Sequence, residues 1–490
     1  MARIEALTAE TAPESARPSL AALRAAFGRA PNLFATFAQS GPALAGLLAT
    51  SPPRPTPSRP ARPSESSQAA GPIEVEQRST GSGLRSMPRH GERSTRYAPM
   101  RDAAHPIAVN AALVHTPSRR VTGLERIWLV ADALWPPFVN QLVVHGEGTP
   151  DVDAWRRAVA VLGGAWPAAR ARLRGVLGFT RWVADGVEPP LIVVDAASSW
   201  EAGALAAPET AIDRALSRPL DPRRGPIVEV VLTRDAVVLR THHAAFDGRA
   251  AWAMAEDLAA ILRGAPPRGA AFAGVDDALG GAAERAPPPD APALIAWGEH
   301  RRWRRIDIPS GPRPLPRVLV ALARSAGARV RLSVPVDLRR HLSEPRVAAN
   351  LSGFVRLDVT PDARPDAVRA ALEARLEEAK GALRAADGVR HVPLAVLGVL
   401  GAAAARGEAR RGRGVVSASV SNLGRQDASV FDHGDFRGRG LFWIPPANPG
   451  SPVFVSLAGH AGGVSLCFAG AGADPLAVDR LASAVVAALP

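Results

Sequence analysis

The stretch HHAAFDG, residues 242–248, decides how this sequence is interpreted. It follows residues 227–241 (IVEVVLTRDAVVLRT), whose apolar pattern predicts a β-hairpin that turns near Arg234. A helix is predicted to follow over about 250–262. HHAAFDG therefore lies in a loop between a strand and a helix, where a rigid scaffold often presents catalytic side chains.

The loop carries the residue types that proton transfer needs. A neutral imidazole is the side chain best matched to removing a proton near neutral pH, so His243 is the candidate general base. Gly248 allows the backbone to approach a substrate closely and would expose an N–H to an oxyanion. Asp247 would fix the geometry of the loop, because a buried carboxylate needs a partner.

Other interpretations of these residues remain open. His243 could be a core histidine, and His242 could pack or hydrogen-bond behind it. A metal site of His242, His243 and Asp247 is disfavoured, because adjacent residues of an extended backbone point to opposite faces; we expect no metal. Cys467 lies in the apolar strand GVSLCFAG and is expected to be a buried thiol rather than a nucleophile.

HHAAFDG matches the HHxxxDG motif, and residues 121–490 resemble the chloramphenicol acetyltransferase-like, or condensation-domain-like, superfamily of acyltransferases. Three later segments match in order and spacing: VPVDLRRHL (334–342), AANLSGFVRLDV (348–359) and VSNLGR (420–425). The resemblance implies an α/β layered fold of two lobes, about 121–300 and 301–490. It also implies a tunnel through which the donor and the acceptor reach the motif.

The resemblance further implies a role for each matching residue. His243 corresponds to the catalytic base, while Asp247 is structural and pairs with an arginine of the second lobe, for which Arg339 is the candidate. A bidentate arginine–carboxylate pair would hold the loop rigid. Ser421 and Asn422 match a strand end that would bind substrate or steady the oxyanion. A turn that satisfies its own backbone is the alternative for both.

The remaining elements of residues 121–490 alternate between strands and helices, as expected for a layered α/β fold. ERIWLVADA (125–133) has strand character. Thr149 and Pro150 are placed to begin a helix, and a long helix is predicted over 365–385. Strands are predicted at 329–337, 351–359 and 415–422, a strand pair follows them, and a helix ends the chain.

The first 120 residues differ from the rest. Residues 1–50 resemble the N-terminus of carboxymuconolactone decarboxylase-like and alkylhydroperoxidase-like proteins, but the paired cysteines of that family are absent. We interpret this segment as a two-helix remnant without that activity. Residues 51–120 are rich in Pro, Arg and Ser and predict a disordered linker. Reading the gene in its other two frames over this linker would test whether a frame shift or fusion joined the two parts.

The net charge of +13 could indicate a nucleic-acid partner. Seven of these charges lie in the first 120 residues, however, and Lys380 is the only lysine among 59 basic residues, which indicates a GC-rich codon bias. The cluster EHRRWRR (299–305) is either a solvated face or a site where Arg301 and Arg302 contact phosphates of coenzyme A or phosphopantetheine. We expect no nucleic-acid partner.

The sequence thus predicts an acyltransferase that moves an acyl group from a coenzyme A or carrier-protein thioester to an alcohol or amine. Acyl-CoA or a phosphopantetheinyl carrier protein would be the donor substrate, and no other cofactor is expected. A peptide-synthetase-type amide-forming enzyme and a non-catalytic docking protein of a biosynthetic assembly remain alternatives. The longest apolar run, about 392–405, is shorter than the roughly 20 residues that span a bilayer, so no integral membrane association and a cytoplasmic location are expected.

Overall fold

The structure, a computed structural model, describes residues 116–175, 179–272, 287–344, 346–381, 386, 389, 392–447 and 451–490. All of them belong to one compact unit, and a second unit, Pro52–His115, lies outside them. The two-helix remnant expected at 1–50 and most of the linker expected at 51–120 lie outside the described residues. The end of that linker was predicted wrongly, because Ser118–Arg120 is a strand of the described unit.

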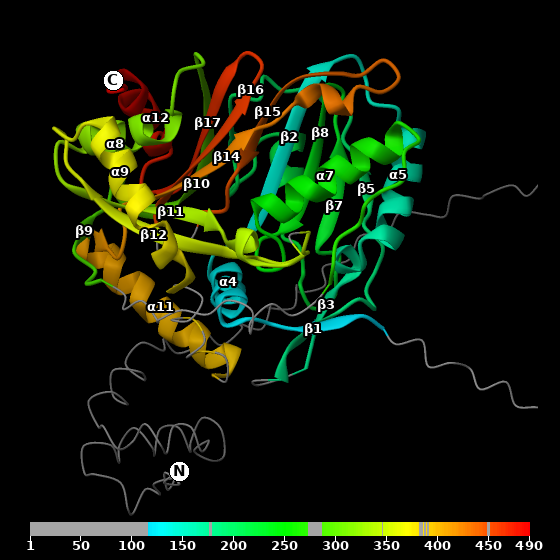
Figure 1. Cartoon of the computed structure of the whole chain (residues 1–490), viewed down its shortest axis with the longest axis horizontal. Coiled ribbons are helices and arrows are strands. Elements are labelled where there is room, and N and C mark those ends of the chain that lie inside the picture. Colours follow the sequence, from blue (N-terminus) through cyan, green and yellow to red (C-terminus); the bar gives the residue numbers. More distant parts are fainter. Residues whose placement is uncertain are drawn as a thin grey trace, which may run out of the picture. The chain divides into compact units, whose positions relative to one another are not determined.

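The first of two large sheets carries the motif (Figure 1). Its strand order is β15 (Arg437–Ile444), β2 (Val139–Glu147), β8 (Ala236–His242), β7 (Val228–Leu232) and β5 (Leu191–Val193). Only the β5–β7 pair is parallel. The helices α5 (Val152–Ala165) and α7 (Gly248–Leu262) cover one face of this sheet.

Side-chain alternation along the strands gives this sheet two buried faces. Leu142 and Val144 of β2 belong to the core that contains α5 and α7, whereas Val143 between them belongs to another core with Trp303 and Phe442. The strands β7 and β8 are buried along their whole length. This explains why their sequence is nearly continuous in apolar residues rather than alternating.

The second sheet has seven strands. Their order is β12 (Ser352–Val359), β11 (Val330–Asp337), β14 (Ala418–Arg425), β16 (Val453–His460), β17 (Gly463–Gly472), β10 (Trp297–Ile308) and β6 (Ala202–Ala204). The pairs β11–β14 and β14–β16 are parallel and the others antiparallel. The core of this sheet includes residues of α8 (Pro314–Ala326), α9 (Pro365–Ala374) and α12 (Ala477–Ala487).

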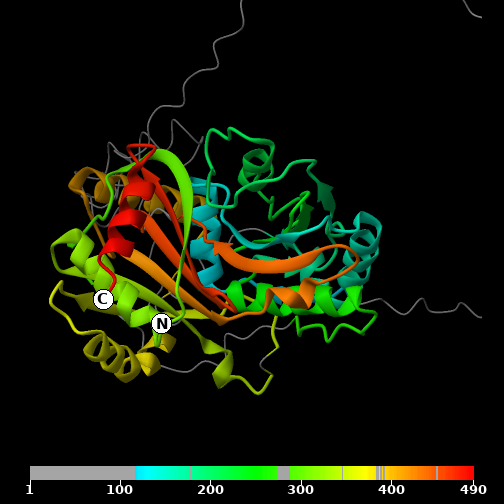
Figure 2. The same ribbon diagram turned by 90° about the horizontal axis from the view of Figure 1, so that it is seen from above.

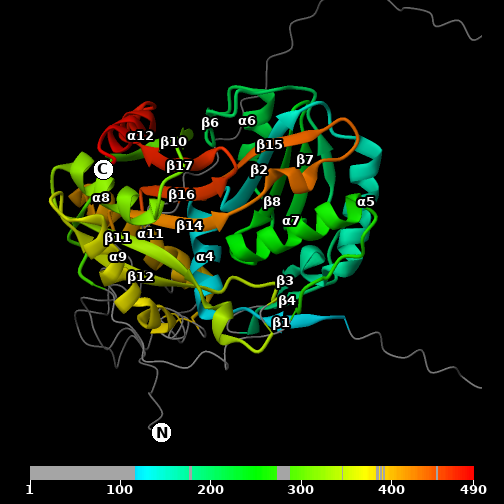
Figure 3. The same cartoon turned by 45° about the horizontal axis from the view of Figure 1, so that its top comes forward.

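Two strands cross the lobe boundary expected near residue 300. β6, from the first half, joins the seven-stranded sheet at β10, and β15, from the second half, joins the five-stranded sheet at β2. Figure 3 shows β15 running beside β2, and Figure 2 shows the same crossing from above. Each sheet is therefore completed by a strand from the other half of the sequence.

Smaller elements complete the described unit. They are the helices α4 (Gly123–Leu134), α6 (Ala211–Ser217) and α11 (Leu394–Arg411), the strands β1 (Ser118–Arg120), β3 (Arg172–Arg174), β4 (Arg181–Val183), β9 (Ala291–Pro292) and β13 (Arg413–Gly414), and the 3-10 turns Pro167–Arg170, Leu338–His341, Leu376–Ala379 and Ala428–Phe431. None of the described helices is long and apolar enough to span a membrane.

Some sequence predictions of local structure were wrong. The segment predicted as a strand from 125 is helix α4, because Thr122 and Glu125 form a capping box: the Thr122 hydroxyl accepts from the Glu125 amide and the Glu125 carboxylate accepts from the Thr122 amide. Helix α5 is capped by Asp151 rather than by Thr149. The helix predicted over 365–385 ends at Ala374 and is followed by a 3-10 turn.

Candidate active site

The HHAAFDG loop joins the end of β8 to the start of α7, as the sequence predicts. The amides of Ala245 and Phe246 donate to the carbonyl oxygen of His242, which makes a tight turn. Asp247 is the N-cap of α7, and its Oδ1 accepts from the Ala250 amide at 2.9 Å. Gly248 is thus the first residue of the helix, where backbone N–H groups have no acceptor within the helix.

Asp247 also forms the predicted ion pair with Arg339, but through one nitrogen–oxygen contact and not the bidentate pair expected, because Nε and Nη2 of Arg339 donate to backbone carbonyls. Its Oδ2 lies 2.8 Å from Arg339 Nη1 and accepts from the Leu351 amide at 2.7 Å. The two residues are 2% and 4% exposed. Burial alone would raise the pKa of Asp247, but the charge of Arg339 and these hydrogen bonds hold the pKa below its usual value.

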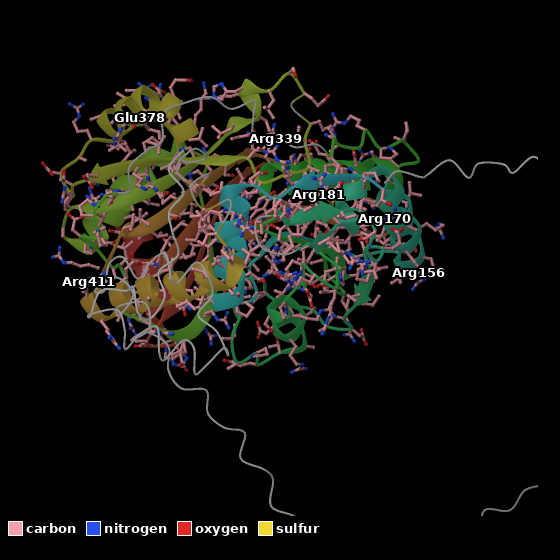
Figure 4. All side chains as sticks on the ribbon, turned by 90° about the horizontal axis from the view of Figure 1, so that it is seen from below. Arg156, Arg170, Arg181, Arg339, Glu378 and Arg411 are labelled. Carbon is pink, nitrogen blue, oxygen red and sulfur yellow. The ribbon has the colours of Figure 1, made fainter. Side chains whose placement is uncertain are left out.

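Arg339 is saturated with acceptors. Its guanidinium donates to Asp247, to Asp337 Oδ1 at 3.0 Å and to the carbonyl oxygens of Val347 and Ala349. Figure 4 shows Arg339 in the middle part of the molecule, away from the edges where Arg156 and Arg411 lie. The pair therefore ties the motif loop to the segment that follows β11, as a structural ion pair would.

His243 is held by its backbone and packs against two aromatic rings. Its amide donates to the Phe138 carbonyl at 3.0 Å, and its own carbonyl accepts from Asn350 Nδ2 at 2.7 Å. The ring centroids of Phe138 and Trp128 lie 5.1 and 5.7 Å from the imidazole. Within the described residues, Nδ1 of His243 has no hydrogen-bond partner.

The electrostatic environment keeps the His243 imidazole neutral at physiological pH. Burial lowers its pKa to about 4, and the neighbouring His242 also lowers it, while Asp247 acts in the opposite direction. A neutral imidazole has a free lone pair and can accept a proton. The arrangement can therefore perform base chemistry without a prior deprotonation step.

His242 lies on the other side of the chain and is completely buried. Its Nδ1 accepts from the Ala244 amide at 3.2 Å, and its Nε2 lies 3.5 Å from Asp132 Oδ2. It does not line the cavity that contains His243. This position agrees with the interpretation of His242 as a residue that supports the loop from behind.

A cavity of about 660 Å³, counting the part open to solvent, surrounds His243. It is lined by residues of both sheets: Trp128, Phe138, Asn140, His243, Gly248, Pro335, Ser352, Phe354, Ser419, Ser421, Leu423, Trp443, Ile444, Pro445, Phe454 and Ser456. Most of these side chains are apolar, and the polar ones are hydroxyls or amides. A cavity of this composition suits an uncharged substrate group beside the imidazole.

The two residues predicted at the strand end have different positions. Ser421 lines the cavity with His243, whereas Asn422 is exposed and its Oδ1 accepts from the Gly424 amide at 3.1 Å. Asn422 therefore makes the self-satisfying turn that was the alternative for it. Of the pair, only Ser421 is near the candidate base.

Arg301 and Arg302 lie outside this cavity, in β10. Arg301 donates to the carbonyl oxygen of Pro136, and Arg302 lies 3.0 Å from Glu209. Trp303, next to them, is buried between the sheets. The basic cluster 299–305 is thus part of a strand in the second sheet, and some of its arginines form hydrogen bonds or ion pairs within the protein.

Sequence reasoning missed two asparagines that hold the loop. Asn140 Nδ2 donates to the Phe246 carbonyl at 2.8 Å, as Asn350 does to His243. Both side chains are buried. The available signal was an amide residue within an otherwise apolar stretch, because a buried amide needs hydrogen-bond partners.

The single cysteine is a buried thiol, as expected. Cys467 is fully buried in β17, and burial raises the pKa of its thiol far above the usual value. It does not line the cavity around His243. Cys467 is therefore no nucleophile for this site.

No family model matches the sequence, and no curated protein does either. Solved structures with the same fold do exist. The first condensation domain of the calcium-dependent antibiotic synthetase, in complex with a substrate analogue, is 17% identical with a TM-score of 0.52 over 76% of this chain and 96% of its own.

Two other neighbours are also condensation domains. The domain of the Monacolin K polyketide synthase MokA is 11% identical, with a TM-score of 0.50 over 76% of this chain and 96% of its own. A mutant starter domain of the rhizomide synthetase RzmA in complex with C8-CoA is 12% identical, with a TM-score of 0.50 over 76% and 94%. These likenesses confirm the two-lobed α/β fold expected from the sequence.

Proposed function

This chain has the condensation-domain fold, and we propose that it is an acyltransferase in which His243 is the general base. The observation that carries the proposal is the neutral imidazole in a cavity lined by both sheets, on a loop fixed by the Asp247–Arg339 pair. A base with a depressed pKa is in its reactive form at neutral pH.

In the proposed reaction, an acceptor hydroxyl or amine attacks the carbonyl carbon of an acyl thioester. His243 removes the proton of the acceptor as the new C–O or C–N bond forms, and the carbonyl oxygen becomes an oxyanion. The C–S bond then breaks, and the proton passes from the imidazolium to the leaving thiolate. The products are an ester or amide and a free thiol, and the enzyme returns to its starting state.

The N-terminus of α7 and the Ser421 hydroxyl are the proposed partners of the oxyanion. The Gly248 amide has no acceptor within the helix, and the positive end of the helix dipole favours negative charge. Both residues line the same cavity as His243. Donors fixed before the reaction stabilise a developing charge without reorganisation.

The proposed donor is a thioester of coenzyme A or of a phosphopantetheinyl carrier protein. The RzmA starter domain with the same fold binds C8-CoA, which supports a thioester donor here. An amide-forming reaction with an amine acceptor is the second candidate, because an amine can replace the alcohol as acceptor and the similar structures include a condensation domain of an antibiotic synthetase. The two candidates differ only in the acceptor.

Mass spectrometry of products from the purified full chain tests the proposal. The chain is given a panel of acyl-CoA and acyl-carrier thioesters with alcohols and with amines. We expect an ester or amide in at least one pairing, and its loss in His243→Ala with the fold retained. His300→Ala is a control outside the cavity. Full activity of His243→Ala would overturn the mechanism, and no product from any pairing would favour a non-catalytic docking role.

A further inference from the structure

A second chamber adjoins the cavity around His243. It has a volume of about 930 Å³, counting the part open to solvent, and lies among α4, α11 and strands of the second sheet. Trp128, Phe354 and Ser419 line both spaces. The two spaces therefore adjoin at these three side chains.

The two helices that wall the chamber present mostly apolar surface. Their lining residues are Ile127, Val130, Ala131 and Leu134 of α4 and Gly401, Ala404 and Ala405 of α11. The buried guanidinium of Arg126 donates to the carbonyl oxygens of Val389 and Val392, which ties α4 to the segment before α11. The two helices pack closely at Gly401, where an added Cβ would lie 3.0 Å from Val130 Cγ1.

Glu408 is the exception in this apolar wall. It lines the chamber, is 7% exposed and is the one buried residue among those described in α11. Among the described residues no ion pair with its carboxylate is found, although the charge of Arg411 lowers the pKa of Glu408 and Arg356 of β12 also lines the chamber. Val415, at the turn after the helix, supplies a backbone hydrogen bond.

The position of Glu408 is not explained by helix stability. It lies in the last turns of α11, where the negative end of the helix dipole disfavours an acid. Burial raises the pKa of this carboxyl, which means that its charge is costly where it stands. A buried carboxylate that has no ion-pair partner is stabilised by a ligand that brings a positive charge into contact with it.

We propose that the second chamber receives the apolar body of one substrate and that Glu408 selects substrates with an ammonium group at the end remote from the reacting carbon. The proposal rests on the proposed acyl transfer at His243, since it concerns the substrate of that same site. Glu408 accepts a hydrogen bond from the remote group and does not take part in the reaction. It is therefore a specificity-determining residue.

Binding of octyl probes to the full chain tests this without any reaction. Octylamine, octanol and octanoate are titrated by calorimetry at pH 8. Hydrogen bonds to charged groups are worth about tenfold or more in affinity, so octylamine should bind about tenfold more tightly than octanol, and octanoate most weakly. Ala405→Phe, which fills the chamber, should weaken binding of all three probes.

Substitution of Glu408 tests whether its carboxylate causes the preference for octylamine. Glu408→Gln keeps an oxygen for the Val415 amide and should lose the preference for octylamine, while Glu373→Gln, an exposed acid of α9, should keep it. Thermal melts show whether each variant is folded. Equal binding of octylamine and octanol by the wild type, or an unchanged preference in folded Glu408→Gln, would overturn the proposal.

Steady-state kinetics show whether the donor or the acceptor is the substrate that carries the remote group into the chamber. Octanoyl-CoA is compared with 8-aminooctanoyl-CoA as donor, and octanol with 8-amino-1-octanol as acceptor. The substrate whose kcat/KM rises with the amino group, and falls back in Glu408→Gln, is the one that enters the chamber. If no pairing reacts but the binding preference is present, the proposed function fails and the selectivity of the chamber stands.

Discussion

The side-chain amide of Asn350 donates to the carbonyl oxygen of His243 at 2.7 Å. The segment leading into β12 thereby fixes the backbone of the candidate base across 107 residues of sequence. Together with the Phe138 carbonyl, which accepts from the His243 amide, this contact sets where the imidazole stands in the cavity. Asn350 positions the base and does not itself contact the proposed reacting atoms.

Asn350→Ala should therefore lower activity through the position of His243. The His243 carbonyl would lose its partner, at a cost of about 1–3 kcal/mol in the free energy of unfolding. We expect kcat to fall about tenfold or more with a smaller change in KM, because misplacement of a base impairs the chemical step. Steady-state kinetics and denaturant unfolding measure both, with Asn422→Ala as a control expected to stay within about twofold of wild type. An unchanged kcat would show that the contact has no positioning role.

Loss of either partner of the Asp247–Arg339 pair should destabilise the fold. Arg339→Met leaves the Asp247 carboxylate buried without its cation, and Asp247→Ala does the converse; each should cost about 3–5 kcal/mol in the free energy of unfolding. The double variant leaves no buried charge unpaired, so its loss should be clearly smaller than the sum of the single losses. Urea unfolding of all four proteins measures this coupling, and strictly additive losses would contradict it.

The pH dependence of activity should follow the depressed pKa of His243. Its imidazole is neutral above a folded-state pKa of about 4, so kcat/KM should stay level from pH 8 to pH 6 and fall only as the pH approaches that value. A limb near the ordinary histidine value would instead show that the imidazole is solvated in the working enzyme. Rates in overlapping buffers, corrected for unfolding, give the profile.

The same pKa makes stability depend on pH. The unfolded imidazole titrates near 6.5 and the folded one near 4, so the unfolded chain binds the proton more tightly. The contribution of the neutral His243 imidazole to the free energy of unfolding is complete above pH 6.5, and it is lost as the pH falls from 6.5 towards 4. His145, whose pKa burial also lowers to about 4, titrates in this window too. The contribution of His243 is therefore the difference between the wild type and His243→Ala in unfolding measured from pH 7 to pH 4.

Gly248→Ala should be tolerated only if the Leu423 side chain moves. A Cβ on Gly248 would lie 2.6 Å from Leu423 Cδ2, well inside the contact distance. Gly248→Ala should then reduce kcat/KM by about tenfold, because a displacement of about 1 Å near the chemistry can cost more than that. Leu423→Ala should restore part of the loss when combined with Gly248→Ala. Absence of any rescue would indicate that the methyl group acts on the substrate and not on Leu423.

Ser421→Ala and Asn422→Ala should differ although the two residues are adjacent. Ser421 lines the cavity with His243, while Asn422 does not. Removal of a hydrogen-bond donor to an oxyanion lowers kcat by a factor of about 10²–10³ in well-studied cases. Ser421→Ala should therefore lower kcat by about 10²-fold. Single-turnover rates are the measurement. Similar rates for the two variants would exclude Ser421 as an oxyanion donor.

The motif and its ion pair were accessible from sequence because each part is a local pattern. HHAAFDG lies between a strand and a helix, and Arg339 lies in a segment that matches the superfamily in order. The contacts of the asparagines with the loop were not accessible, because Asn140 and Asn350 meet it only through tertiary packing across about one hundred residues. The Glu408 chamber was hidden for the same reason, since it requires α4 to face α11.

For two segments, the local sequence pattern alone did not decide the structure. In α4 the apolar run near Trp128 was given strand character, although Thr122 and Glu125 three residues apart carry the capping signature of a helix start. In β10, the arginines beside Trp303 were predicted to form a solvated face or to contact phosphates, and in the structure they are half-buried while Trp303 is buried. The strand pairs on both sides there, with β17 and with β6, so its burial is decided by neighbours far away in sequence.

The exchange of β6 and β15 between the two sheets bears on how this chain can be divided. A cut near residue 300 would leave each fragment with an unpaired sheet edge, because the strand that covers that edge is encoded on the other side of the cut. Such halves would expose main-chain donors and acceptors and associate with one another or aggregate. The two lobes therefore have to be expressed together, on one chain, for both sheets to be complete.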